Sequence, residues 1–265
     1  TGFVLMDHLT IQGISVFLYA AGAVVTFGLL LLSRRRDQRT FASLAGVGLS
    51  VLLALLVAPG LFHDLYARLL WKRAYTPERG FAHVVETKSG VITVTREGGI
   101  YGGGIYDGAF STNLVDDRNH IIRAYALSAL HPAPRRVLMV GLASGSWAQV
   151  IAHHPQVESL TIIEINPGYL EIIPRFPEVA SLLRNSKVEI VIDDGRRWLA
   201  RHPDRRFDFV VQNTTWHFRA HATNLLSTEY LALTAEHLAP GGVLFFNTTG
   251  SRDAQLTAAK SFPHA

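Results

Sequence analysis

The stretch VLMVGLASG, residues 137–145, decides the fold class of this chain. It leads from an apolar strand directly into a loop that contains Gly141 and Gly145. Glycine has no Cβ, so it adopts positive φ easily and lets backbone N–H groups face a ligand. In an open parallel sheet, ligands bind beyond the carboxyl ends of the strands, where such a loop can approach a nucleotide closely. The stretch therefore predicts the nucleotide-binding edge of an α/β sheet.

Four further apolar runs follow this loop. LTIIE ends at Glu164, VEIVIDD ends at Asp194, FDFVV occupies residues 207–211, and another run follows the Pro-Gly-Gly turn at residues 240–242. Such runs alternate with helical stretches as far as Thr249, which is the pattern of a parallel sheet wound on both faces by helices. The sequence therefore predicts a doubly wound, Rossmann-like α/β domain.

Acidic residues stand at the ends of two of these runs. Glu164 lies roughly 20 residues after the glycine loop, which is the offset of an acid that holds a ribose. Asp193 and Asp194 end the next run. An ionised carboxylate is a strong acceptor of hydrogen bonds from hydroxyl groups. The residues also allow another interpretation, in which these acids cap the helices that begin after each strand.

Two long apolar segments precede the predicted sheet. Residues 11–32 carry no charge, and residues 41–62 form a second stretch interrupted only by Pro59. About 20 apolar residues cross the hydrocarbon core of a bilayer. A signal peptide has a shorter apolar region without a second span, and a buried core helix should have a polar face. We therefore expect a transmembrane hairpin, packed closely through its small residues. These include Gly22, Gly28, Gly46 and Gly48.

Basic residues around the hairpin favour opposite orientations. Between the spans lies SRRRDQRT, residues 33–40, and a basic loop is typical of the cytoplasmic side. After the second span, residues 63–75 are also basic, and their aromatic residues are typical of a segment at the membrane interface. We expect an integral protein of the bacterial inner membrane, with the side of its soluble domain left open. The arginines would meet anionic lipid headgroups.

The composition fits a membrane-attached globular domain. The 265 residues are 48% hydrophobic, with a mean hydropathy of +0.20 and a net charge of +4. No stripe of interleaved basic and aromatic residues indicates nucleic-acid binding. We expect a membrane part at residues 1–76, a small β-rich domain at 77–115 and the α/β domain at 116–265. Because the sequence starts without methionine and stops after a helical stretch, we expect further spans upstream and further strands downstream.

The β-rich segment shows hairpin patterning. Residues 81–99 alternate apolar and polar side chains around a Ser-Gly turn, and a glycine-rich stretch follows at residues 100–113. Within that stretch, Asp107-Gly108 is expected to form a hairpin turn. Asp116 or Asp117 then suits the N-terminus of a helix.

From about Val84 onward, the sequence resembles the spermidine synthase family, the polyamine aminopropyltransferases. That family carries a small β-domain followed by a methyltransferase-like sheet. The resemblance covers roughly two thirds of the chain. The matching stretches are YDG at 106–108, DD at 116–117, VLMVGLASG at 137–145, IIEIN at 162–166, IDDGRRWL at 192–199, FDFVV at 207–211, LLSTEYL at 225–231 and LAPGGVL at 238–244.

The resemblance implies a nucleoside pocket for S-adenosylmethionine or decarboxylated S-adenosylmethionine. Glu164 would bind the ribose hydroxyls, and Asp194 would bind the adenine amino group. The remaining residues of the expected cofactor pocket are Gly141, Ser144, Gly145, Asp193 and Asn213.

The chain departs from the family where the amine would bind. The family has an aspartate in the glycine loop, where this chain has Ser144, and an Asp-Ser-Ser-Asp segment after the fourth strand, where this chain has residues 213–216. Ser111 replaces a glutamine, and His120 and Ile122 replace a tyrosine and a glutamate. A buried dicationic polyamine would lose its counter-charges there. We therefore do not expect ordinary spermidine synthesis.

Two hypotheses remain for the function. The first is a membrane-anchored transferase with another acceptor, and its candidate catalytic residues are His120, Asp193 and His217, because histidine suits a general base. The second is a non-catalytic scaffolding subunit of a membrane complex that keeps only the fold. Other membrane subunits or a second copy would be its partners. His217 and His221 lack a third ligand, so no metal site is expected.

Overall fold

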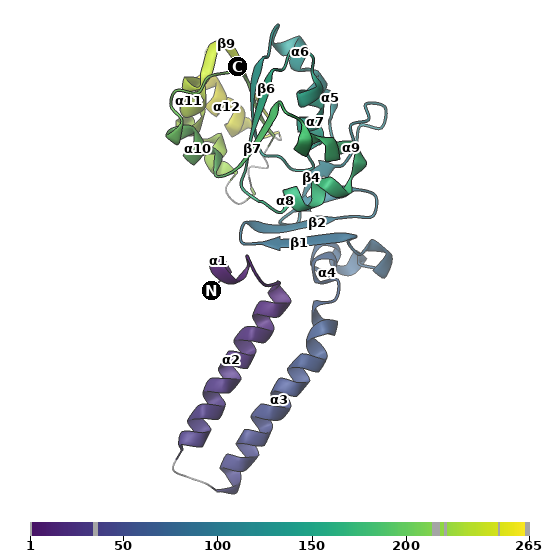
Figure 1. Ribbon diagram of the computed structural model, residues 1–265, viewed down its shortest axis with the longest axis vertical. Helices are drawn as coiled ribbons and strands as arrows, with labels where there is room; N and C mark the ends of the chain where they lie inside the picture. Colours follow the sequence, from purple (N-terminus) through teal and green to yellow (C-terminus); the bar gives the residue numbers. More distant parts are fainter. Residues whose placement is uncertain (1, 34–36, 214–217, 220–221, 249, 263–265) are drawn as a thin grey trace.

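The structure is a computed structural model that describes residues 2–33, 37–213, 218–219, 222–248 and 250–262. Two long helices project from one end, and two β-sheets with the shorter helices around them form the rest of the molecule (Figure 1). The small sheet lies between the helix pair and the large sheet. The chain therefore builds a helical hairpin, a small sheet and an α/β domain in sequence order.

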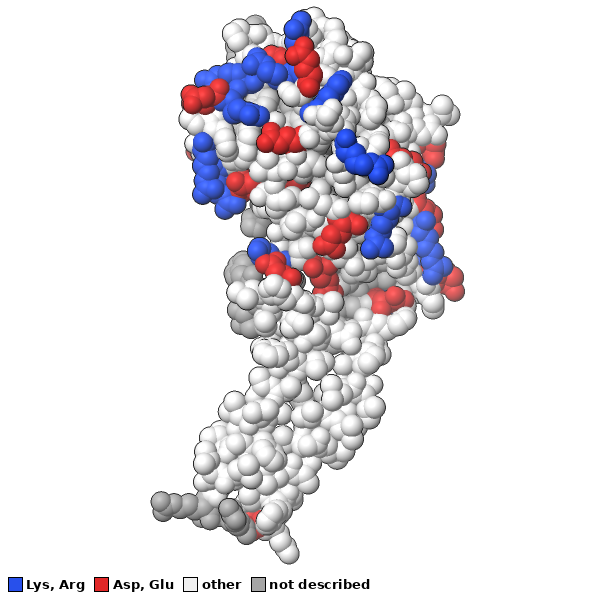
Figure 2. All heavy atoms as spheres, viewed as in Figure 1, with Lys and Arg blue, Asp and Glu red and all other residues white. Residues whose placement is uncertain are grey.

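The two long helices are apolar over most of their length. They have 22 and 25 residues, which corresponds to about 33 and 38 Å. Figure 2 shows their surface almost without charged side chains, whereas charged side chains are scattered over the domain beyond them. Only a small share of each helix is buried, so neither is a core helix of the domain, and both are long and apolar enough to cross a membrane. The bounds are α1 (Gly2–Leu5), α2 (Ile11–Leu32) and α3 (Gln38–Phe62).

Four glycines of the long helices do not take part in the contact between α2 and α3. A Cβ built at each of four positions meets no atom within 4 Å. The prediction that these glycines let α2 and α3 pack closely is therefore wrong, because the four positions face open space rather than the neighbouring helix. They are Gly22, Gly28, Gly46 and Gly48.

The small sheet is an antiparallel meander in the order β1-β2-β3-β4. Thr87 pairs with Gly90, so the first hairpin turns through Lys88 and Ser89, one residue earlier than the Ser-Gly turn expected from the sequence. The strands are β1 (His83–Thr87), β2 (Gly90–Val94), β3 (Gly99–Gly102) and β4 (Ile105–Ala109).

The turn expected at Asp107-Gly108 is found elsewhere. Both residues lie inside β4. The chain reverses instead at Gly103 and Gly104, whose φ angles are +58° and +80°. Only glycine adopts such angles readily, and the run of three glycines supplies them before the Asp-Gly pair is reached. This correction places the Asp107 side chain on a strand, where it can face the large sheet.

A short helical segment joins the hairpin to the small sheet. Trp71 packs edge-on against Tyr101 of β3, with ring centroids 5.9 Å apart. Its indole N–H donates to the Arg79 carbonyl at 3.0 Å. The segment expected at the membrane interface is therefore fixed on the small sheet. It consists of α4 (Leu65–Trp71), η1 (Lys72–Ala74) and η2 (Pro77–Arg79).

The helix expected after the two aspartates begins later than predicted and is broken. Asp117 accepts hydrogen bonds from the backbone N–H of Ile121 at 2.6 Å and of Ile122 at 3.2 Å. It therefore occupies the N-terminal position that the sequence favours for an acid. Two single-turn helices follow, α5 (Ile122–Tyr125) and α6 (Leu127–Leu130).

The large sheet is parallel, in the order β7-β6-β5-β8-β9. This confirms the doubly wound sheet predicted from the apolar runs. The strand order reverses between β5 and β8, which is the switch point at which ligands of such sheets bind. The strands are β5 (Arg136–Val140), β6 (Ser159–Glu164), β7 (Val188–Ile192), β8 (Phe207–Gln212) and β9 (Leu238–Phe246).

Each face of the large sheet has its own apolar core. Leu138 packs with Trp198 and Tyr230 on one face. Met139, the next residue, belongs to the cluster that contains Trp147 on the other face. Successive residues of a strand point to opposite sides, so one apolar strand fills two cores. The covering helices are α7 (Ser146–His153), α8 (Tyr169–Ile172), η3 (Ile173–Arg175), α9 (Pro177–Ala180), η4 (Ser181–Arg184), α10 (Gly195–Arg201), η5 (Thr223–Leu226), α11 (Thr228–Glu236) and α12 (Arg252–Ser261).

Candidate nucleoside site

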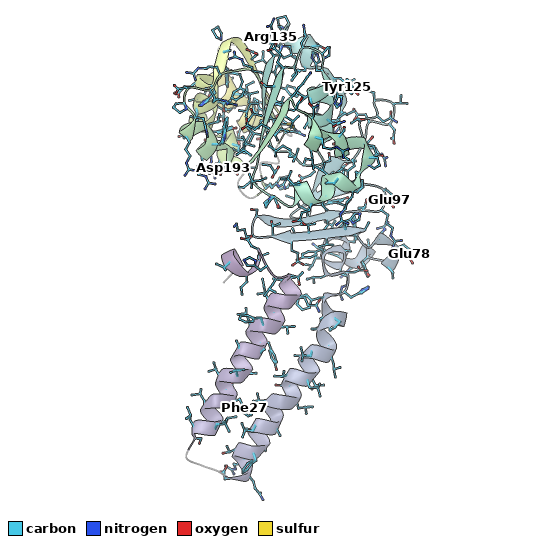
Figure 3. All side chains as sticks on the ribbon, viewed as in Figure 1. Phe27, Glu78, Glu97, Tyr125, Arg135 and Asp193 are labelled. Atoms are coloured by element: carbon cyan, nitrogen blue, oxygen red, sulfur yellow. The ribbon has the colours of Figure 1, made fainter. Side chains whose placement is uncertain are left out.

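The carboxyl edge of the large sheet faces the small sheet. Figure 3 shows Asp193, just after β7, at the rim nearer the small sheet, and Arg135, just before β5, at the opposite end. The glycine loop and Asp193 follow strands, and Glu164 is the last residue of β6, so all three share this edge. The parallel topology therefore brings together the residues that the sequence analysis placed at strand ends.

The glycine loop takes backbone conformations that favour glycine. Gly141 and Gly145 have φ angles of +91° and +76°. A Cβ on Gly145 would lie 3.1 Å from Ile173 Cδ1 and 3.2 Å from Leu182 Cδ2. The loop therefore needs glycine at 145 for both its φ and its packing, and it turns sharply from β5 into α7.

Glu164 closes this loop from the end of β6. Its residue exposure is 5%. One carboxylate oxygen accepts the Leu142 N–H at 2.7 Å, and the other accepts the Asn166 N–H at 2.8 Å. Burial raises the pKa of the Glu164 carboxyl above its usual value, although these two amide hydrogen bonds act in the opposite direction. Glu164 is thus a buried carboxylate fastened to the glycine loop, and it does not cap a helix.

The two aspartates after β7 are already engaged. Asp193 forms ion pairs with Arg197 and, at 4.0 Å, with Arg201. Asp194 is the N-cap of α10 and accepts the backbone N–H groups of Arg196 at 2.9 Å and Arg197 at 3.2 Å. Burial opposes ionisation of Asp194, but the hydrogen bonds from Arg196 and Arg197 hold its pKa below the usual value. The capping interpretation therefore describes Asp194, whereas it does not describe Glu164.

The cap predicts a modest effect of replacing Asp194. Asp194→Ala should lower the free energy of unfolding by about 1 kcal/mol, the usual contribution of an N-cap. Asp194→Ser should recover most of this loss, because serine also caps helices. Urea unfolding of the purified chain measures both variants. A stability equal to wild type in the alanine variant would contradict the capping role.

Ser144 is linked to the small sheet through Ser146. It is 3% exposed, and its Oγ accepts the Ser146 N–H at 3.3 Å. Ser146 Oγ in turn donates to the Ala109 carbonyl of β4 at 2.8 Å and accepts the Ser111 N–H at 3.2 Å. The position where the resembling family has an acid therefore belongs to a neutral hydrogen-bonded contact between the loop and β4.

The other candidate residues are placed less centrally. Asn213 follows β8 directly and is half-buried. His120 is exposed at a φ of +51°, and none of the described hydrogen bonds or ion pairs links it to Glu164 or to the glycine loop. His217 and His221 lie outside the described residues. Within the described part of the chain, no cluster of three His, Asp or Glu side chains could hold a metal ion.

A buried charged network that the sequence analysis missed lies next to Glu164. Asp107 of β4 forms an ion pair with both terminal nitrogens of Arg219, one of them at 2.9 Å. The Tyr169 hydroxyl donates to Asp107 at 2.7 Å. Burial alone would lower the pKa of Arg219, but the Asp107 carboxylate outweighs it and raises that pKa. The network joins β4, the start of α8 and the segment after β8.

Gly102 makes room for this network. A Cβ at that position would lie 2.3 Å from the Asp107 carboxylate and 2.6 Å from the Tyr169 hydroxyl. No other residue fits without moving the charged groups. YDG is the one signal in the sequence that marked Asp107, and nothing nearby marked Tyr169 or Arg219 as its partners.

Comparison with known proteins identifies the family. The model of the spermine/spermidine synthase domain matches residues 121–259, about half of the chain. The chain is 34% identical over 113 residues to the polyamine aminopropyltransferase of Desulforudis audaxviator, covering 42% of this chain and 41% of that protein. It is 30% identical over 145 residues to the Streptococcus uberis enzyme of the same name, covering 51% and 50%. The match thus covers half or less of the length of each of these curated relatives.

Solved structures show the same fold. A spermidine synthase in complex with the transition-state analogue AdoDATO superposes with a TM-score of 0.59 at 20% identity, covering 69% of this chain and 65% of that one. The Thermotoga maritima spermidine synthase gives 0.57 at 18% identity, covering 69% and 64%. The parallel sheet, its glycine loop and the extent of the family match lead to one conclusion. The chain belongs to the spermine/spermidine synthase family.

Proposed function

We propose that this chain is a membrane-anchored member of its family that binds an S-adenosylmethionine-type nucleoside and transfers a group to an acceptor other than an ordinary polyamine. The observation that carries the proposal is Glu164. It is a buried carboxylate at the carboxyl edge of the sheet, hydrogen-bonded to the glycine loop.

The geometry around Glu164 suits a ribose. A carboxylate has about four acceptor positions. Two are used by the amides of Leu142 and Asn166, which leaves capacity for two ribose hydroxyls. S-adenosylmethionine or its decarboxylated form would supply a carbon activated by a neighbouring sulfonium. The residues of this chain would hold the nucleoside and exclude water from one side of it.

The acceptor side does not suit a dicationic polyamine. Such a ligand needs buried carboxylates as counter-charges. Ser144 is neutral and bonded to the contact with β4, and Asn213 is neutral as well. Arg219 adds a cation to this edge, and it already occupies the carboxylate of Asp107. We therefore expect putrescine to bind weakly, with or without nucleoside.

The helix pair supports attachment to a membrane. α2 and α3 are each longer than the hydrocarbon core of a bilayer, and their apolar side chains are exposed. Exposed residues include Phe17 at 52%, Val24 at 71% and Leu56 at 68%. A water-soluble protein rarely carries so large an apolar surface. We propose that the helix pair is inserted in a bacterial inner membrane. A protease-protection test on oriented membranes determines on which side the domain lies.

One observation favours a second candidate function, a non-catalytic scaffolding or accessory subunit. Asp193 and Asp194 are bonded to arginines and to the start of α10. An adenine amino group would have to compete for the same oxygens. A chain whose acids only stabilise its fold would bind no nucleoside, and its partners would be other membrane subunits or a second copy.

Calorimetry separates the two candidates. The full chain in detergent is titrated with S-adenosylmethionine, decarboxylated S-adenosylmethionine and methylthioadenosine. We expect saturable binding of at least one of them and no heat from putrescine. If a folded sample binds none of the three nucleosides, the transferase proposal fails and the scaffold remains.

A further inference from the structure

Asn166 connects the candidate site to the small sheet. Its backbone N–H donates to the Glu164 carboxylate at 2.8 Å. Its side chain reaches the β1–β2 turn, where its Oδ1 lies 2.9 Å from Thr87 Oγ1 and its Nδ2 donates to the Gly90 carbonyl at 3.3 Å. Asn166 and Thr87 are 6% and 7% exposed. One buried residue thus holds the site carboxylate with its backbone and the small sheet with its side chain.

Close packing fixes the distance between these two parts. Asn166 Oδ1 also accepts the Gly168 N–H at 3.0 Å. A Cβ on Gly168 would lie 2.8 Å from Val85 Cγ1 and 3.1 Å from Ile92 Cδ1. The segment after Glu164 therefore lies directly against β1 and β2, and a small shift of these strands must move Asn166 as well.

The same strand holds the helix pair. Glu86 of β1 accepts a hydrogen bond from the Tyr66 hydroxyl of α4 at 2.9 Å. It also accepts the backbone N–H of Ile11, the first residue of α2. On the adjoining turn, Lys88 pairs with Asp7 at 2.6 Å. Both ends of the helix pair thus meet β1 beside the residue that contacts Asn166.

We infer that Asn166 is a positioning residue through which the small sheet, anchored to the helix pair by Glu86, sets the Glu164 carboxylate for nucleoside binding. The inference rests on the proposed function and deepens it. The bonded path leads from Glu86 through its neighbour Thr87 to Asn166 and Glu164, and it ends at Leu142 in the glycine loop. Asn166 acts through Glu164 and need not touch the nucleoside.

Two variants of Thr87 test the central contact. Thr87→Val has nearly the same volume but lacks the hydroxyl, whereas Thr87→Ser keeps it. With the full chain in lipid nanodiscs, we expect Thr87→Val to bind methylthioadenosine about tenfold more weakly than wild type, because it loses the hydroxyl that contacts Asn166 Oδ1 and accepts the Ser89 N–H. Thr87→Ser should restore the affinity to within about twofold. A general loss of packing would not be rescued by the smaller serine.

The membrane end of the path has its own pair of variants. Glu86→Ala removes the acceptor shared by Tyr66 and Ile11, and we expect it to weaken methylthioadenosine binding about fivefold. Glu97→Ala, at the exposed β2–β3 turn (Figure 3), should leave the affinity unchanged. If the Glu86 and Glu97 variants bind methylthioadenosine with equal affinity, the contact between Glu86 and the helix pair does not affect the nucleoside site.

Hydrogen exchange tests the same contact without a ligand. The Leu142 and Asn166 amides are both bonded to Glu164. In Thr87→Val both should exchange at least tenfold faster, and in Thr87→Ser they should match wild type. If wild type binds no nucleoside, the proposed function fails while these rates still measure the positioning. Unchanged exchange and unchanged affinity in Thr87→Val would overturn the inference.

Discussion

Arg219→Met should lower the free energy of unfolding by about 3 kcal/mol, because it leaves Asp107 as a buried carboxylate without its counter-charge. The Asp107 side chain is 7% exposed and that of Arg219 is 28% exposed, so little solvent can replace the guanidinium. Urea unfolding of the full chain in mild detergent, followed by tryptophan fluorescence, measures the loss.

Arg135→Met is the matched control. Arg135 pairs with Glu158 at 3.4 Å, but both side chains are 64% exposed. Exposed pairs contribute about 0–1 kcal/mol, so this variant should be close to wild type. The double variant Asp107→Asn with Arg219→Met removes both charges and should recover part of the loss. If Arg219→Met is as mild as Arg135→Met, the network does not join the two sheets.

Glu164→Ala should weaken nucleoside binding about 100-fold. Two ribose hydroxyls would lose a charged acceptor, and hydrogen bonds to charged groups each contribute about 1.5–3 kcal/mol. Titration calorimetry with methylthioadenosine measures the change. Glu97→Ala is a suitable control, since Glu97 lies on the exposed turn of the small sheet. Wild-type affinity in Glu164→Ala would exclude Glu164 from the nucleoside site.

Because the pKa of Glu164 is raised, nucleoside affinity and folding stability should change with pH in opposite directions. Burial raises the pKa above its usual 4.5, so the folded state binds the proton more tightly than the unfolded chain. Its contribution to stability is therefore greatest below pH 4.5 and is lost as the pH rises through the folded pKa. Nucleoside affinity should rise over the same range, because the ionised carboxylate is the better acceptor. Glu164→Gln should flatten both profiles.

The strands were predictable because a short run of apolar residues indicates a buried strand. The runs around Glu164 and before Asp193 became the neighbouring parallel strands β6 and β7. The span 11–32 became α2 with the same bounds, since the Thr10 side chain caps its first turn and a charged stretch begins at Arg34, just after its end. Strands and apolar spans of this kind depend on residues that are adjacent in the sequence, so they can be predicted from the sequence alone.

The contacts that build the site were not predictable in the same way. Asp107, Tyr169 and Arg219 come from three elements far apart in the chain, and only the docking of the small sheet brings them together. Asn166 likewise meets Thr87 across 79 positions of sequence. The direction in which Gly22 faces depends on the rotation of α2 against α3, which composition does not encode. Sequence patterns thus located the edge of the site, and tertiary packing determined its chemistry.

Glu86 and the Asp7–Lys88 pair give the domain two attachments to its helices, one before α2 and one after α3. A domain on a single linker swivels freely above a bilayer, whereas two attachments leave it at most one hinge axis. If the helices cross a membrane, the carboxyl edge of the large sheet stays close to one height above the lipid and can tilt only about that axis. An acceptor that diffuses within the bilayer would then search for the site in two dimensions and approach it from one direction.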